Sequence, residues 1–224
     1  MKSNKTIVEL SKKYDTDKKM NDGNKCRNGV LGHDYAKQYD DILNDLEVKT
    51  ILEIGVSWGA SIKMWDEYFN DSVNIIGVDI NEKRFKKKQI ENKRLKIFIG
   101  NQGNEKFLNT FKNYSFDLII DDGSHRMRDQ QISFKTLFKF LRKGGVYVIE
   151  DLHTSNIVSF FDSNPETTTL ELLEYMQRNE TYESNYISNE EYCRILSEIK
   201  EIKIFKNKIL NTEKTYIIAF IKKR

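Results

Sequence analysis

Short apolar runs alternate with helical patterns from residue 50 onward. Each run is nearly continuous in apolar residues, mainly Ile and Val, and the five runs are Thr50–Ile54, Val73–Ile80, Leu95–Ile99, Phe116–Asp121 and Gly145–Ile149. Such runs are typical of parallel strands that are buried on both faces. Between them, helical spacing places Ile62, Trp65 and Phe69 on one face of a helix, and Phe134, Leu137, Phe138 and Leu141 on one face of another. Strands and helices in regular alternation predict a doubly wound α/β sheet.

The C-terminal region has a different pattern. Glu201–Leu210 and Thr215–Lys222 are two strand-like runs joined by the short polar stretch Asn211-Thr212-Glu213-Lys214. This spacing predicts a hairpin, so one C-terminal strand must run antiparallel to the rest of the sheet. A dinucleotide-binding dehydrogenase instead ends on a parallel strand. The pattern therefore argues against that class.

Two segments lie outside this alternation. We expect residues 1–48 to form a polar, helical leader or lid, and residues 49–224 to form the main domain. Residues 155–200 are also polar and are predicted to be helical, with a loop around Pro165. Because 155–200 is long for a connection, we expect it to lie near a functional site.

Composition narrows the function classes. The 224 residues contain 37 Lys and Arg against 34 Asp and Glu, a formal net charge of +3. This near balance argues against a protein that coats nucleic acid. No apolar stretch approaches the roughly 20 residues of a membrane span, and the N-terminus has no apolar signal region. With Cys26 and Cys193 far apart, we expect a reduced, cytoplasmic protein without a disulfide.

Ligands of open α/β sheets bind at the carboxyl ends of the strands. After the first strand, Gly55 and Gly59 bracket a turn that lacks the G-x-G-x-x-G phosphate loop of dinucleotide sites. The glycine pair alone is equally typical of a plain tight turn. Asp79 ends the second strand, where a carboxylate can accept the hydrogens of a ribose diol or cap the next helix. Gln102 follows the third strand, where an adenine edge would lie.

Acidic residues gather after the fourth and fifth strands. The fourth continues into Asp121-Asp122-Gly123-Ser124-His125, and the fifth into Glu150-Asp151. Four carboxylates on neighbouring strand ends would repel one another without a cation, and a hard divalent ion prefers oxygen ligands. The alternative is that Asp121 caps a helix and Asp151 is a solvated loop acid.

Taken in order, the glycine turn, Asp79, Gln102 and the acidic fourth strand resemble the class I S-adenosylmethionine (SAM) methyltransferases. The stretches Ile119–His125 and Val148–Leu152 resemble the metal-dependent sugar O-methyltransferases, which include enzymes of bacterial polysaccharide loci. This resemblance implies a Rossmann-like, seven-stranded, mostly parallel sheet of order 3-2-1-4-5-7-6, with a C-terminal antiparallel hairpin and helices on both faces.

The resemblance also implies site residues. Asp122, Glu150 and Asp151 would hold the divalent cation, Mg²⁺ first and Mn²⁺ as the alternative, and His125 would be the general base. The predicted cofactor-binding residues are Glu53, Gly55, Ser57, Ser61, Asp79, Gln102 and Asp121.

The leader carries the same resemblance. Tyr14-Asp15-Thr16-Asp17-Lys18 and His33-Asp34-Tyr35 match family motifs that have glycine where this chain has Asp15 and Asp34. The two replacements put the local turn geometry in question. His153 stands where a Gln is more common.

The chemistry implied is methyl transfer from SAM to a hydroxyl of a sugar, with a nucleotide-linked sugar or heptose for surface polysaccharide as the expected substrate. A cation that ligates two hydroxyls would lower the pKa of the attacking one, and His125 would take its proton. The alternatives are a metal-dependent O-methyltransferase for a small diol or natural product, and a non-catalytic interaction module with the SAM fold. The basic run Lys83–Lys96, with Phe85 and Ile90 expected to face the core, is either a solvated helix face or an attraction for anionic substrates. The sequence leaves open whether the chain forms a homo-oligomer.

Overall fold

The computed structural model describes residues 3–26, 29–69, 71–84, 92–164, 166–209 and 212–224. Within them, one sheet has the strand order β3-β2-β1-β4-β5-β7-β6. The strands are β1 (Thr50–Ile54), β2 (Asn74–Asp79), β3 (Leu95–Ile99), β4 (Phe116–Asp121), β5 (Leu141–Ile149), β6 (Ile199–Lys208) and β7 (Thr215–Lys223). The first five pair in parallel, whereas β7 runs antiparallel to both of its neighbours. The strand order and the antiparallel hairpin predicted from the sequence are confirmed.

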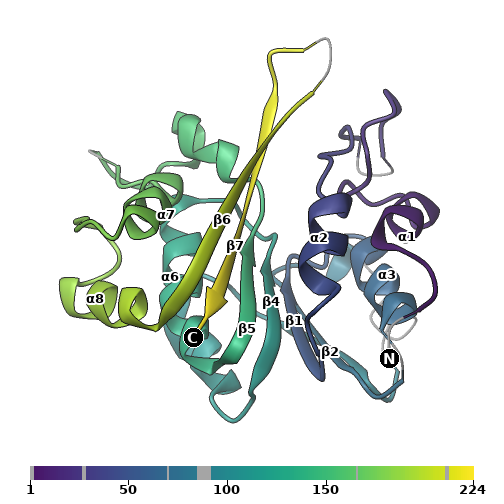
Figure 1. Cartoon of the computed structure of the whole chain (residues 1–224), viewed down its shortest axis with the longest axis horizontal. Helices are drawn as coiled ribbons and strands as arrows, with labels where there is room; N and C mark the ends of the chain where they lie inside the picture. Colours follow the sequence, from purple (N-terminus) through teal and green to yellow (C-terminus); the bar gives the residue numbers. More distant parts are fainter. Residues whose placement is uncertain (1–2, 27–28, 70, 85–91, 165, 210–211) are drawn as a thin grey trace.

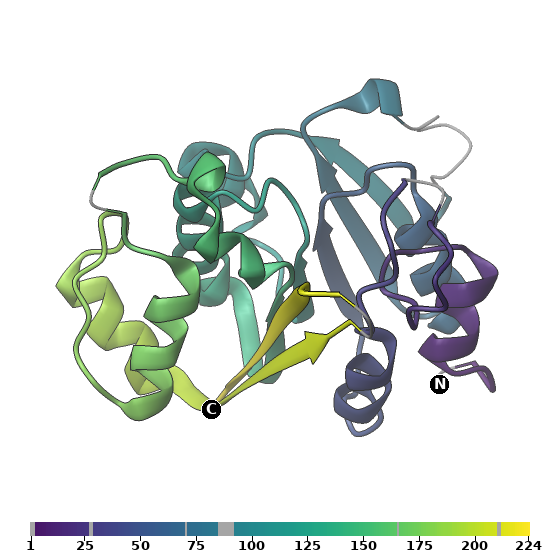
Figure 2. The same cartoon turned by 90° about the horizontal axis from the view of Figure 1, so that it is seen from above.

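Helices cover both faces of this sheet (Figures 1 and 2). One layer holds α1 (Ile7–Lys13), α2 (Ala36–Leu43) and α3 (Ala60–Tyr68), and the other holds α5 (Glu105–Leu108), α6 (Met127–Leu137), α7 (Thr169–Arg178) and α8 (Asn189–Glu198). Alternate strand residues feed the two cores: Leu118 and Ile120 face the first layer, while Ile119 faces the second. This is the period-two alternation of an extended strand.

The leader packs into the first core. Ile7, Leu10, Tyr39 and Leu43 from α1 and α2 are fully buried in the same cluster as strand residues of β1 and β4. The helix α1 begins at a capping box, in which Thr6 and Glu9 satisfy each other's backbone N–H groups. Hydrophobic burial therefore holds the leader against the sheet.

Helix α6 ends earlier than its apolar spacing predicts. The helical face was expected to include Leu141, but α6 stops at Leu137, continues as a 3₁₀ turn, and Leu141 begins β5. Leu141 pairs with Phe116 on β4 and is buried there. An apolar residue at this position satisfies the helix period and a strand start equally well, so periodicity alone misassigned it.

Among its described residues, the segment 155–200 contains helices joined by irregular stretches. Its main helices, α7 and α8, pack against the second face of the sheet. Asn211 of the hairpin link, Pro165, and the expected core residues Phe85 and Ile90 lie outside the described residues. Among the described residues, no helix is long and apolar enough to cross a membrane.

Gly55 is where two strand ends come closest. Its φ is +95°, and a Cβ atom built there would overlap the backbone carbonyl of Asp122, which follows β4. The Asp122 N–H in turn donates to the Ile54 carbonyl at 3.0 Å. A glycine is thus required both by conformation and by space.

We expect Gly55→Ala to lower the free energy of unfolding by roughly 3 kcal/mol or more, because the methyl group displaces the β4 end in addition to straining the backbone. Gly23→Ala is the matched control, since Gly23 has φ +82° but nothing within 4 Å of the added Cβ. The control should lose only about 1–2 kcal/mol. Urea denaturation measures both, and equal losses would contradict the steric argument.

Candidate active site

A pocket of about 920 Å³ opens at the carboxyl ends of the parallel strands. This size suits a small-molecule ligand, and the position is where open α/β sheets bind theirs. The lining residues come from the leader, the strand ends and β7, and include Asp17, His33, Gly55, Ser57, Trp58, Asp79, Gln102, Asp122, His125, Asp151, His153 and Tyr216. From 155–200 only the first part contributes to this lining, with Ile157 and Phe160.

Asp79 is fixed at one side of the pocket by the turn after β1. Its Oδ2 accepts the Ser57 N–H at 2.8 Å and its Oδ1 accepts the Asn81 N–H at 2.8 Å. Asn81 itself accepts the Lys83 N–H at 3.0 Å, so it caps the turn that follows. Asn81, and not Asp79, thus takes the helix-cap position, while Asp79 holds the backbone of both turns and lines the pocket.

Gln102 lies between a buried acid and the fourth-strand loop. Its Nε2 donates to Asp121 Oδ1 at 3.0 Å, and its Oε1 accepts the Ser124 N–H at 2.7 Å. Asp121 is fully buried, also accepts a hydrogen bond from Ser133, and does not line the pocket. Burial raises the pKa of Asp121 to about 6. Asp121 thus orients Gln102, and Gln102 faces the pocket.

Glu53 lies one layer below the glycine turn. It is fully buried and accepts hydrogen bonds from Ser61 Oγ at 3.0 Å and Trp65 Nε1 at 3.2 Å. Burial raises its pKa to about 7, against the opposing effect of the Lys18 charge. The structure does not bring Glu53 into the main pocket, and Ser61 lines only a small adjoining pocket of about 50 Å³.

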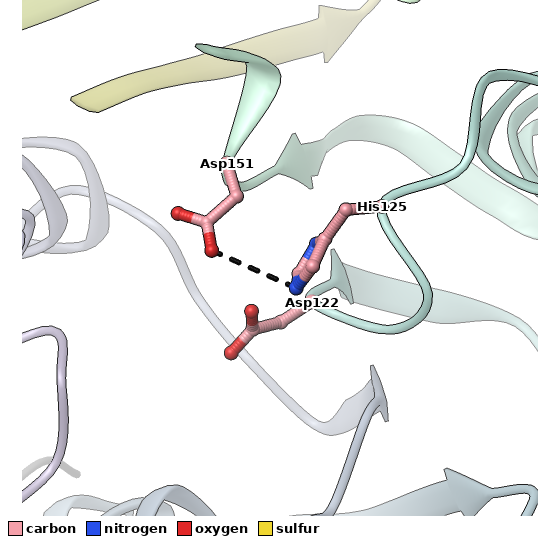
Figure 3. Close-up of side chains that lie close together, drawn as sticks. All are labelled: Asp122, His125 and Asp151. Atoms are coloured by element: carbon pink, nitrogen blue, oxygen red, sulfur yellow. Dashed lines mark ion pairs between the residues drawn. The ribbon is translucent and has the colours of Figure 1, made fainter. Parts of the chain in front are cut away.

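Three of the predicted reaction-centre residues do converge. Asp122, His125 and Asp151 each offer a ligand atom, and these atoms lie within 4.8 Å of one another. The three side chains point toward a common space, with His125 Nε2 3.6 Å from Asp151 Oδ2 (Figure 3). The two carboxylates fit a divalent cation with positions left for other ligands, and the imidazole beside them can either ligate the ion or accept a proton. Within the described part of the chain, no hydrogen-bond partner faces the buried His125 Nδ1.

Glu150, the third predicted metal ligand, lies outside this cluster. Its side chain is 1% exposed; its Oε1 accepts the Tyr39 hydroxyl at 2.5 Å and lies 3.0 Å from Lys18 Nζ. Burial, and then the neighbouring Asp122, raise the pKa of Glu150 well above its usual value. Its carboxylate is thus held by the leader, below the wall of the pocket.

Asp151 is surrounded by imidazoles. His33 Nδ1 lies 3.1 Å and His153 Nδ1 3.9 Å from its Oδ1, so all three histidines of the sequence approach this one carboxylate. The Tyr35 hydroxyl also donates to Asp151 at 2.9 Å. Burial alone would raise the pKa of Asp151, but the histidine charges outweigh it and hold that pKa well below its usual range.

Sequence reasoning assigned no role to four leader residues that hold this site. Lys18, His33, Tyr35 and Tyr39 reach acids more than 100 positions away along the chain. The available signal was the pair of leader motifs that contain three of them. In these two motifs Asp15 and Asp34 stand where glycine is expected, and both have a positive φ, of 55° and 60° respectively. Aspartate tolerates this region better than most residues, so the turns are retained.

Comparisons with known proteins find relatives of this chain among methyltransferases. A family model described as a methyltransferase domain matches residues 47–214. The mycinamicin VI 2''-O-methyltransferase of Micromonospora griseorubida is 35% identical over 66% of this chain, and a rhamnosyl-tetracenomycin 3'-O-methyltransferase of Streptomyces olivaceus is 40% identical over 47% of it. The solved structure of MycE, a methyltransferase from the mycinamycin pathway in complex with Mg, SAH and mycinamycin VI, matches 98% of this chain with a TM-score of 0.68 and 27% identity.

The chain spans only part of these relatives. The alignments cover 36% and 28% of the two curated proteins, and the structural match covers 53% of MycE. The family model, however, matches more than half of this chain and includes all of the strand ends described above. The chain therefore belongs to the family of methyltransferase domains.

Proposed function

We propose that the protein is a SAM-dependent O-methyltransferase that methylates a sugar hydroxyl with the help of a divalent cation. The observation that carries this proposal is the convergence of Asp122, His125 and Asp151 on the wall of the pocket that also holds Asp79. A donor site and an acceptor site in one pocket are what group transfer between two small molecules requires. The relatives named above, one of them in complex with Mg and SAH, support the same assignment.

The donor end of the pocket is the turn after β1 together with Asp79 and Gln102. In this proposal Asp79 accepts the two ribose hydroxyls and Gln102 bonds an adenine edge, and both residues line the pocket. Gly55 lines this end of the pocket, and its missing Cβ leaves room for the Asp122 backbone beside the turn. Glu53 and Asp121 support this end from below through Ser61 and Gln102.

At the acceptor end, Asp122 and Asp151 hold the cation and His125 accepts a proton. A bound Mg²⁺ or Mn²⁺ supplies a positive charge that lowers the pKa of a coordinated hydroxyl. His125 takes the hydroxyl proton at Nε2, the nitrogen that faces the cluster in Figure 3. Glu150 reaches the cation only if its contacts to Lys18 and Tyr39 rearrange, so we assign it to the support of Asp122.

The chemical class of the methyl acceptor is inferred from the relatives. The name of one relative specifies a rhamnosyl group on tetracenomycin. We expect a sugar here as well, and the nucleotide-linked sugar expected from the sequence is one form that it can take. A panel of UDP-, GDP- and TDP-linked sugars and free rhamnosides, incubated with SAM and Mg²⁺ and analysed by mass spectrometry, identifies the carrier. No methylated product from any sugar, together with product from a catechol, would contradict a sugar acceptor.

Removal of the divalent cation should abolish methyl transfer. We expect activity with the best acceptor of the panel to disappear in EDTA and to return with excess Mg²⁺ or Mn²⁺. Asp122→Asn should lower activity at least a hundredfold at saturating SAM, whereas Asp41→Asn, which changes an exposed carboxylate on α2, should leave it unchanged. Full activity in EDTA would overturn the metal role.

His125→Ala should lower kcat by roughly 10²–10⁴-fold, because the proton then has no positioned acceptor. The dissociation constant for S-adenosylhomocysteine should stay within twofold of that of the unmodified chain, since none of the contacts described above joins His125 to Asp79. Single-turnover rates and calorimetry separate the two effects. An unchanged rate would remove His125 from the mechanism.

Asp79→Asn should weaken S-adenosylhomocysteine binding by roughly tenfold to a hundredfold. The amide cannot accept both backbone N–H groups that the carboxylate accepts, and it loses the charge-assisted bonds to a diol. Calorimetry measures the change. Asp71→Asn is the control, because that side chain is fully exposed, and equal affinities for both variants would contradict the diol role.

A further inference from the structure

A lysine from the leader is buried among the acids of three strands. Lys18 Nζ lies 2.6 Å from Asp122 Oδ2, 3.0 Å from Glu150 Oε1 and 3.7 Å from Glu53 Oε1. The Lys18 side chain is only 1% exposed, and it does not line the pocket. It therefore cannot be a surface anchor, and it does not touch a ligand in that pocket.

Its position divides the acidic residues into two groups. On one side of the Asp122 carboxylate is the open cluster with His125 and Asp151, and on the other is the ammonium of Lys18. Glu150 is not part of that cluster, and its carboxylate lies beside the Lys18 ammonium. The charge of Lys18 thus acts on Asp122 from behind, while the space in front of Asp122 stays accessible from the pocket.

A buried charge that loses its partner is strongly destabilising, because desolvation is no longer compensated. Without Lys18, the carboxyl groups of Glu53, Asp122 and Glu150 would lose the cation that they share, and Asp122 would lose the partner that holds it. A divalent cation in front of Asp122 would compensate part of the same loss. The lysine and the cation therefore act on one set of charges, and each must weaken the other's contribution.

We infer that Lys18 is a positioning residue, an internal counter-cation that fixes Asp122 and Glu150 and moderates the affinity of the adjacent site for divalent metal. The metal part of this inference rests on the proposed function. The positioning part rests only on the ion pairs, and it is tested without metal.

The first arm uses the full chain in EDTA. Lys18→Met keeps the length of the side chain and removes its charge, and we expect the thermal midpoint to fall by roughly 10 °C. Adding Glu150→Gln removes one uncompensated carboxylate, and the double variant should recover at least half of that loss. Recovery of folding by the double variant when Lys18→Met is insoluble supports the inference equally. No recovery, or failure of both variants to fold, overturns it.

The second arm titrates Mn²⁺ and follows the free ion by electron paramagnetic resonance. Lys18→Met should bind Mn²⁺ roughly tenfold more tightly than the unmodified chain, and saturating Mn²⁺ should restore part of the lost midpoint. Unchanged or weaker binding contradicts the moderating role, because a merely structural lysine would leave the metal affinity unimproved.

Lys37→Met is the matched control for both arms. Lys37 pairs with Asp41 at 2.9 Å on the exposed face of α2, where an ion pair contributes little. Its midpoint and Mn²⁺ affinity should equal those of the unmodified chain. If no form of the protein binds Mn²⁺, the proposed metal function fails, and the EDTA arm still decides the positioning role.

Discussion

The burial of carboxylates at one edge of the sheet is the constraint on which the rest of the structure depends. Glu53, Asp121 and Glu150 are at most 1% exposed, and Asp151 is 8% exposed. A buried acid must be neutralised, paired or hydrogen-bonded. The buried side chains of the strands are mainly apolar, so most of these partners come from outside the strands. Helices and leader must therefore be placed so that Ser133, Trp65, Lys18 and the tyrosines reach the strand ends.

This constraint also explains the conformation of the pocket residues. Ser57, His125 and Asp151 all have positive φ, between 49° and 57°, although none of them is glycine. Such conformations cost of order 1–3 kcal/mol each and persist only where the surroundings fix them. Here the fixed partners are the Asp79 carboxylate, the fourth-strand loop and the three imidazoles. The side chains that would meet the donor and the acceptor are consequently oriented before any ligand arrives.

The sequence predicted those features that depend on local pattern. Strand ends, the hairpin and the positions of Asp79, Asp122, His125 and Asp151 around one pocket all follow from the position of each residue along its own strand. The sequence did not predict the partner of each acid, because adjacent strand residues point to opposite faces and so meet different elements. Asp121 consequently meets Ser133 on α6, while Asp122 meets Lys18 from the leader. Partners separated by more than 100 positions leave no local signal. The leader motif that contains Lys18 therefore did not reveal its partners, and Tyr39 could not be placed without the fold.

The stacking of His33 on Tyr216 has a consequence for the order in which the site is assembled. The two rings lie 3.9 Å apart, although one residue belongs to the leader and the other to β7. Asn207 on β6 donates to the backbone carbonyls of His33 and Asp34, and Tyr35 donates to the Ile217 carbonyl. Contacts so distant in sequence carry the largest loop-closure cost. During synthesis these contacts can form only after β6 and β7 have been made, so the leader takes its final place beside Asp151 late.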